Sequence, residues 1–132
     1  MFERPALEAG GKDIAVEVLD RAVAVRPIGE IDLETAASLQ AALAEALTHA
    51  SPARAVVVDC GGLTFCDSSA LNALLAARRT AQETDTVIRL AAPHPQLRRL
   101  LEITGVLPLF PVDQDPPTAD RSPRGRPDAL PQ

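Results

Sequence analysis

The residues with the clearest chemical potential are two serines behind an aspartate, Asp67-Ser68-Ser69, at the start of an apolar segment. A side-chain oxygen in the first turn of a helix satisfies backbone N–H groups that lack a partner, and the helix dipole favours negative charge there. A serine hydroxyl in this position could be bound, phosphorylated or used as a nucleophile. The simplest interpretation is that Asp67 or Ser68 caps the helix, which contributes about 1 kcal/mol.

A nucleophilic serine needs a base, and the sequence offers only His49 and His94. We expect His49 at the exposed end of a helix and His94 in a loop between two prolines, and neither place suits a catalytic base. The G-x-S-x-G pattern of serine hydrolases is absent around Ser68. No Walker lysine follows Gly61-Gly62, so a phosphate-binding loop is also poorly supported. We therefore expect no catalytic residues, and a small serine-dependent enzyme is the weaker alternative.

A modification switch fits the same residues better. A phosphate on Ser68 would add nearly two negative charges at a helix N-terminus, where the helix tolerates them. We expect Asp67 beside this charge, with Asp59, Glu30 and Asp32 nearby. An acidic or apolar partner surface would then be repelled while the fold stayed intact, which is the property that a reversible switch requires.

The composition excludes several other classes. The net charge is −5, aromatic residues make up 2% and Trp and Tyr are absent, which argues against nucleic acid or an anionic membrane as a direct partner. Cys60 and Cys66 lack metal-type spacing, so we interpret them as small reduced packing residues and expect no metal and no cofactor. The N-terminus MFERPALEAG lacks the apolar core of a signal peptide, which predicts a cytoplasmic protein.

Hydrophobic periodicity predicts an α/β fold with the element order ββαβαβα and a closing strand as an option. Strands that alternate with helices indicate a mixed, mostly parallel sheet of four to five strands with helices packed on it. We expect a flexible segment over residues 1–12, one domain over 13–112 and a disordered Pro-rich tail over 113–132. The expected strands are 14–18, 23–28, 55–59, 86–91 and 109–112, and the expected helices run from 32 or 33 to 49, from 68 to 83, and from 95 to about 104.

Three segments resemble a known family. VVVDCGGLTFCDSSALNALL looks like the signature of the anti-sigma factor antagonists, the single-domain form of the STAS domain. GEIDLETAASL, residues 29–39, is similar to the G-E-[LI]-D turn that opens the first long helix of that family. The segment APHPQLRRLLEITGVLPLF matches the region before the last strand, and the resemblance covers residues 13–112.

The resemblance implies a STAS-like fold and a non-enzymatic partner-switching protein of transcription regulation and stress response. Such a protein binds a serine kinase anti-sigma factor and displaces the sigma factor that the kinase holds. The kinase then phosphorylates the antagonist, and a serine phosphatase restores it through a transient encounter. ATP and Mg²⁺ belong to the kinase. We expect a monomer or a weak homodimer, and a STAS scaffold subunit of a stress-signalling complex is the alternative within the family.

Residue by residue, the resemblance makes Ser68 the phosphoacceptor and Asp67 its acidic neighbour. Ser69 matches a second hydroxyl position that shapes the loop. Glu30 and Asp32 match the G-E-[LI]-D turn, which takes part in the kinase contact.

One position departs from the family pattern, because Ala70 stands where members commonly have Gly. In a helix, Ala is more favourable than Gly by about 1 kcal/mol. We count Ala70 among the partner-binding residues, and its methyl group would matter where a partner backbone approached closely. The expected fold does not depend on this residue. The change from Gly to Ala would instead affect partner binding and phosphorylation.

Overall fold

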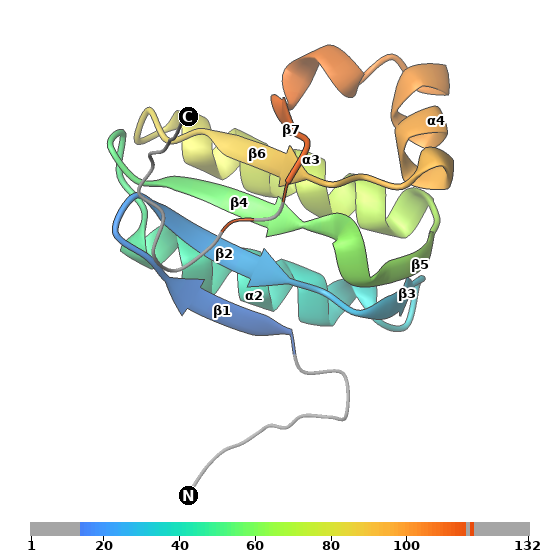
Figure 1. The fold of residues 1–132 in the computed structure, drawn as a ribbon, viewed down its shortest axis with the longest axis horizontal. Coiled ribbons are helices and arrows are strands. Elements are labelled where there is room, and N and C mark those ends of the chain that lie inside the picture. Colours follow the sequence, from blue (N-terminus) through green and yellow to red (C-terminus); the bar gives the residue numbers. More distant parts are fainter. Residues whose placement is uncertain (1–13, 116, 118–132) are drawn as a thin grey trace, which may run out of the picture.

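The computed structural model describes residues 14–115 and residue 117 (Figure 1). The predictions for residues 1–12 and for most of the tail lie outside these residues. In chain order the elements are β1 (Ala15–Val18), β2 (Ala22–Arg26), β3 (Gly29–Ile31), α2 (Ala36–His49), β4 (Ala55–Asp59), the 3₁₀ turn η1 (Cys60–Gly62), β5 (Leu63–Cys66), α3 (Ser68–Gln82), β6 (Ile88–Ala91), α4 (Pro95–Ile103), the 3₁₀ turn η2 (Leu107–Leu109) and β7 (Val112–Asp113).

The main sheet has five strands in the order β1-β2-β4-β6-β7. β1 is antiparallel to β2, and the other pairs are parallel. A hydrogen bond of 2.7 Å from Leu19 N to the Ala22 carbonyl closes the β1–β2 turn. The predicted N-terminal hairpin and the mixed, mostly parallel sheet are therefore confirmed.

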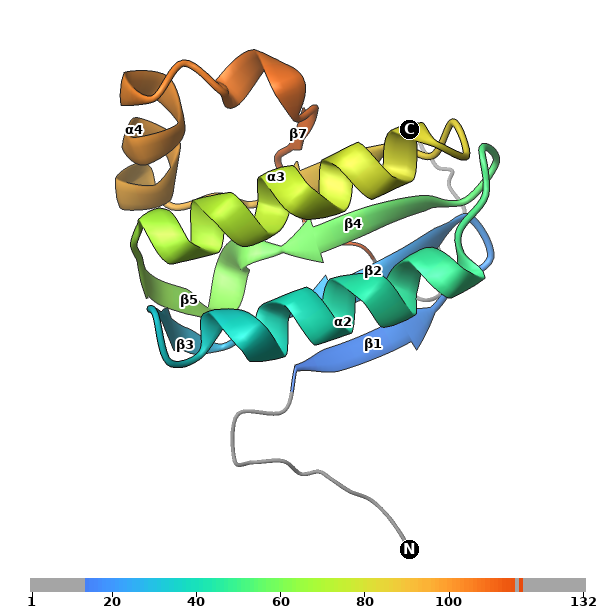
Figure 2. The same ribbon diagram turned by 180° about the vertical axis from the view of Figure 1, so that it is seen from behind.

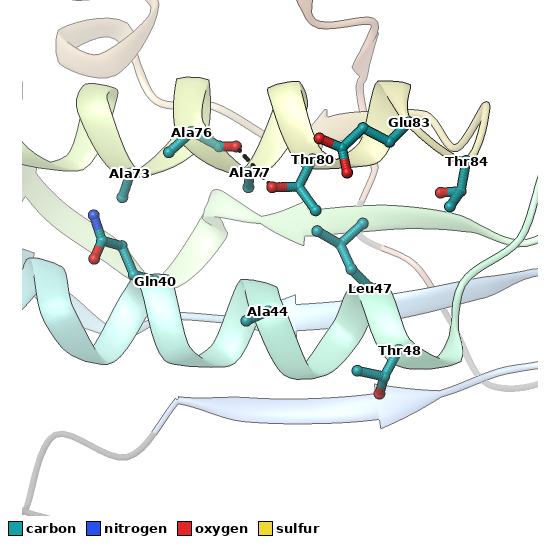
Figure 3. Close-up of a pocket in the computed structure, with 10 residues that line it drawn as sticks. All are labelled: Gln40, Ala44, Leu47, Thr48, Ala73, Ala76, Ala77, Thr80, Glu83 and Thr84. Carbon is teal, nitrogen blue, oxygen red and sulfur yellow. Dashed lines mark hydrogen bonds between the residues drawn. The ribbon is translucent and has the colours of Figure 1, made fainter.

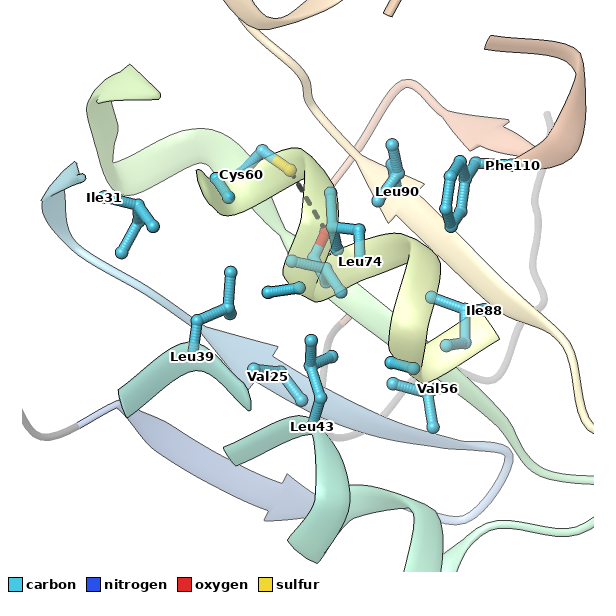
Figure 4. Close-up of a cluster of buried hydrophobic side chains, with 14 of the residues drawn as sticks. Val25, Ile31, Leu39, Leu43, Val56, Cys60, Leu74, Ile88, Leu90 and Phe110 are labelled. Carbon is cyan, nitrogen blue, oxygen red and sulfur yellow. Dashed lines mark hydrogen bonds between the residues drawn. The ribbon is translucent and has the colours of Figure 1, made fainter. Parts of the chain in front are cut away.

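Helices α2 and α3 lie side by side on one face of this sheet (Figures 1 and 2). The core is built between that face and the two helices from aliphatic side chains, as expected for a chain with so few aromatic residues (Figure 4). The inward side chains of the central strands are β-branched or Leu, which suits a pleated and fully buried surface. They include Val23, Val25, Val56, Val58, Ile88 and Leu90, packed against Leu39, Leu43, Leu71, Leu74 and Phe110.

A second, two-stranded parallel sheet of β3 and β5 is a feature that the sequence did not predict. The second strand was expected to reach residue 28, but β2 ends at Arg26. The buried Pro27 follows, and proline has no N–H to continue the ladder. Gly29 then adopts a φ of +83°, which redirects the chain into β3 at little steric cost.

Element boundaries differ in three further places. The first helix begins at Ala36 and not at residue 32 or 33, because a hydrogen-bonded turn at Asp32 precedes it. The strand expected from residue 86 begins at Ile88, after a turn with a φ of +56° at Asp85. The closing strand is Val112–Asp113 and not 109–112, and Leu109 is the last residue of η2. Asp113, assigned to the tail from the sequence, lies in β7 and forms an ion pair with Arg89.

The core should respond to loss of volume at its centre. Leu43 of α2 has no exposed surface, so Leu43→Ala should lower the free energy of unfolding by about 2–5 kcal/mol through lost transfer energy and a cavity. Urea unfolding followed by circular dichroism measures the change. Leu47→Ala on the same helix is the matched control, since Leu47 is only partly buried and should cost less. Equal losses at the two positions would contradict this picture of the core.

Candidate functional site

The start of α3 presents a serine on a capped helix end. Asp67 is the N-cap residue, and its Oδ1 accepts a hydrogen bond of 2.8 Å from Ser69 N. The cap expected from the sequence is therefore present, and Asp67 provides it. Ser68 is the first helical residue; it is exposed and its hydroxyl makes no hydrogen bond to another described residue.

The small β3–β5 sheet brings together the two segments that the sequence analysis singled out. Ile31 is paired with Cys66, and Asp67 N donates a 3.2 Å hydrogen bond to the Ile31 carbonyl. The backbone of the G-E-I-D segment thus lies against the residue before Ser68. Glu30 is exposed and is paired with Phe65 across the ladder.

Asp32 is already used within its own turn. Its Oδ1 accepts hydrogen bonds from Glu34 N at 3.0 Å and from Thr35 N at 3.2 Å. The hydrogen bond from the Thr35 backbone is the largest effect on the Asp32 carboxyl and lowers its pKa, against a smaller opposing effect of desolvation. Asp32 therefore stabilises the turn that precedes α2.

Thr35 is a site-shaping residue that the sequence analysis missed. Its buried hydroxyl donates to the Glu30 carbonyl at 3.0 Å and accepts from Asp32 N at 2.8 Å. The signal was present as an Asp followed three residues later by Thr, a spacing at which side-chain oxygens commonly satisfy the backbone of a helix start.

Asp59 was expected near Ser68, and its carboxylate is hydrogen-bonded to Arg26 and to the loop that follows β4. Its Oδ2 accepts a 2.9 Å hydrogen bond from Arg26 Nη1 in an ion pair. Its Oδ1 accepts a hydrogen bond from Gly61 N at 3.0 Å and so holds the loop that follows β4. Gly62 lies close to Pro27 in this loop, because a Cβ there would be 3.3 Å from the Pro27 carbonyl oxygen and would require a small shift of that backbone.

Ala70 lies in the first turn of α3 but faces inward. Only 2% of its surface is exposed, and it packs in the core cluster. The methyl group that distinguishes it from the family's usual Gly therefore fills the interior and is not presented to a partner.

The cysteines and histidines of the described residues have structural surroundings of their own. Cys60 and Cys66 are buried free thiols, as expected, and burial raises their pKa values to about 12 and about 11. His49 ends α2, whereas His94 caps α4 by accepting from Leu97 N at 3.3 Å. No hydrogen bond joins either histidine to Ser68 within the part of the chain that the structure describes.

A groove of about 460 Å³ lies between α2 and α3 (Figure 3). Its lining comes from Gln40 to Thr48 on α2 and from Ala73 onward on α3, so it follows the later turns of α3 and does not reach Ser68. The lining is mostly alanine and threonine, and among residues 14–115 and 117 no group of acidic, His and Cys side chains could hold a metal ion.

Exposed apolar side chains gather around the β3–β5 sheet instead. Ile28, Leu33 and Phe65 are 78%, 81% and 43% exposed, and we call these three residues the apolar rim. Ile28 and Leu33 flank β3 and Phe65 lies in β5, at the end of the molecule where α3 begins (Figure 2). Ser68, the first residue of α3, thus lies at the same end of the molecule as the apolar rim, and exposed apolar patches are typical of surfaces that bind other proteins.

The STAS domain family model matches residues 13–119, so this chain belongs to the STAS domain family. The expected STAS fold is confirmed. None of the described helices is long and apolar enough to cross a membrane.

Solved structures agree with the family. An anti-sigma factor antagonist from Mycobacterium paratuberculosis is 27% identical, with a TM-score of 0.65 over 80% of this chain and 89% of that chain. A STAS domain protein from Planctomyces limnophilus is 19% identical, with a TM-score of 0.72 over 80% of this chain and 92% of that one. The phosphorylated form of SpoIIAA from Bacillus is 22% identical, with a TM-score of 0.59 over 76% of this chain and 91% of that chain.

The contribution of the Asp32 carboxylate to the stability of the fold should decrease in acid. Because the folded state lowers the pKa of Asp32, its carboxylate stabilises the fold above the unfolded pKa of 3.8, and this contribution is lost as the pH falls through the folded pKa. The stability difference between wild type and Asp32→Ala should therefore be full near about pH 6 and shrink below about pH 4.

Urea unfolding at a series of pH values measures this difference. Asp32→Asn is the matched control, since it keeps an acceptor oxygen but has no carboxyl to titrate. A difference between wild type and Asp32→Ala that stayed constant down to about pH 2 would contradict the assignment.

Proposed function

We propose that this protein is an anti-sigma factor antagonist that is switched by phosphorylation of Ser68. It binds a serine kinase anti-sigma factor in the cytoplasm, and the sigma factor held by that kinase is released. The kinase transfers phosphate from ATP to Ser68, which ends the binding, and a serine phosphatase restores it. The protein itself performs no catalysis in this scheme.

The observation that supports the proposal most strongly is the exposure and the position of the Ser68 hydroxyl. It is exposed, it makes no hydrogen bond to a described residue, and it stands at the first position of a helix whose cap is supplied by Asp67. A kinase can therefore reach the hydroxyl without breaking a structural bond. The helix N-terminus also favours the charge that phosphorylation adds, so the fold can carry the modification.

The apolar rim explains how one phosphate could end an interaction. Ile28, Leu33 and Phe65 expose apolar surface that a partner would cover. A phosphate beside them must be desolvated on binding, and it adds to the charges of Asp67 and Glu30. A partner surface with apolar or acidic groups opposite this place would then dissociate.

The similar solved structures support the same scheme. The Mycobacterium paratuberculosis protein, at 27% identity, is described as an anti-sigma factor antagonist. SpoIIAA has been solved in an unphosphorylated form and in a phosphorylated form, and both are similar in fold to this chain. A fold that is found in both states suits a switch that acts on binding and leaves the domain folded.

The proposal is tested by incubating the protein with purified serine kinase anti-sigma factors and ATP. Wild type should gain one phosphate, located at Ser68 by peptide mapping. Ser68→Ala should gain none and stay bound, whereas Ser68→Glu should bind at least about tenfold more weakly, which corresponds to about 1.4 kcal/mol. Titration calorimetry measures the binding.

Gln82→Glu is the matched control for the added charge, because Gln82 is exposed at the opposite end of α3. It should bind like wild type. A phosphate at another residue, or wild-type binding by Ser68→Glu, would show that the Ser68 switch is wrong.

The apolar rim should contribute directly to the affinity. Leu33→Ser should weaken binding to the same kinase roughly tenfold, as expected for an anchoring residue whose loss costs more than about 1 kcal/mol. Ile103→Ser is the control, since Ile103 is also highly exposed, at 71%, but lies at the end of α4. Equal affinities for the two variants would remove the rim from the interface.

A further inference from the structure

Gln96 on α4 makes a paired contact with the backbone just before the candidate site. Its Nε2 donates a 2.8 Å hydrogen bond to the Cys66 carbonyl, and its Oε1 accepts a 3.2 Å hydrogen bond from Cys66 N. One side-chain amide thus satisfies both backbone groups of one residue, as a neighbouring β-strand would.

The geometry of the β3–β5 ladder explains why these groups are available. In a parallel ladder, alternate residues of a strand direct their backbone groups towards the partner strand. Asp67 N bonds to the Ile31 carbonyl, so the preceding residue, Cys66, directs its N–H and C=O away from β3. Among the described residues no strand pairs with that edge of β5, and Gln96 occupies it.

The helix that carries Gln96 is firmly anchored. Leu97 and Leu101 are buried in the core, and His94 Nδ1 accepts from Leu97 N to cap the first turn. Helix α4 packs against β5 at the end of the molecule where α3 begins (Figure 2). Gln96 itself is exposed, but its side-chain amide extends from a helix that is anchored in the core by Leu97 and Leu101.

We propose that Gln96 is a positioning residue for phosphorylation of Ser68; this inference rests on the proposed function. The backbone before Ser68 is held from two sides, by Gln96 at Cys66 and by β3 at Asp67. Asp67 is thereby kept in the extended conformation, with φ −117° and ψ −168°, that lets it cap α3. Without the Gln96 bonds, the turn samples other conformations and the Ser68 hydroxyl reaches the kinase in the reactive geometry less often.

Gln96→Met tests the inference, because Met has a similar length and removes both hydrogen bonds. Gln82→Met, the same change at an exposed position on α3, is the matched control. The first measurement is NMR-detected amide hydrogen exchange of Cys66 in the free protein. Exchange should become about fivefold faster in Gln96→Met, the effect of losing a bond of about 1 kcal/mol, and stay unchanged in Gln82→Met.

The second measurement is the steady-state kinetics of Ser68 phosphorylation by the kinase that binds the wild type. Gln96→Met should lower kcat about fivefold, with a change in KM of less than about twofold, because positioning acts within the complex. A purely structural role would lower stability and leave kcat unchanged.

The outcomes separate this inference from the proposed function. Unchanged Cys66 exchange in Gln96→Met would show that the paired contact does not hold this backbone. Faster exchange with an unchanged kcat would overturn the positioning role alone. If wild-type Ser68 accepted no phosphate, the proposed function and the positioning role would fail together.

Discussion

The backbone hydrogen bond from Asp67 N to the Ile31 carbonyl joins the turn before α3 to the turn before α2. Each turn leaves the carboxyl end of the small β3–β5 sheet, so this sheet sets the relative position of both helix starts. The contacts of Asp32 and Thr35 stabilise one turn, and the Asp67 cap stabilises the other. The position of the candidate site is therefore set by the backbone pairing of β3 and β5, and the side-chain hydrogen bonds stabilise the turns that this pairing brings together.

The elements that were predicted well are those whose signals are local. The valine run of β4 and the leucines of α3 have clear periodicity, and the Asp67 cap is defined by its immediate neighbours. The β3–β5 sheet was missed because β3 has only three residues and the four residues of β5 do not alternate between buried and exposed side chains. Pro27 and Gly62, which precede the two strands, also approach closely, and this contact between distant parts of the sequence is a property of the whole fold.

The same difference between local and long-range signals applies to the site residues. Ser68 could be found from its place at a helix start, and its exposure agrees with that reading. Asp59 was expected nearby from the sequence, but its ion pair with Arg26 was not, because the two residues become neighbours only through the β2–β4 pairing. Gln96 gave no signal, because a polar residue on an exposed helix position is ordinary until the helix is seen against β5.

Helix α3 has one exposed face, which carries Ser68, and one buried face, which packs in the core. Ser68 and Asn72, one turn apart, are exposed, whereas Ala70, Leu71 and Leu74 are buried in the core. Side chains three and four residues apart share a face, so the face that carries Ser68 contributes little to the interior. A charge placed on Ser68 meets solvent, the helix N-terminus and any bound partner, but not the core. A modification of Ser68 would therefore change the surface of α3 and leave the packing beneath it the same.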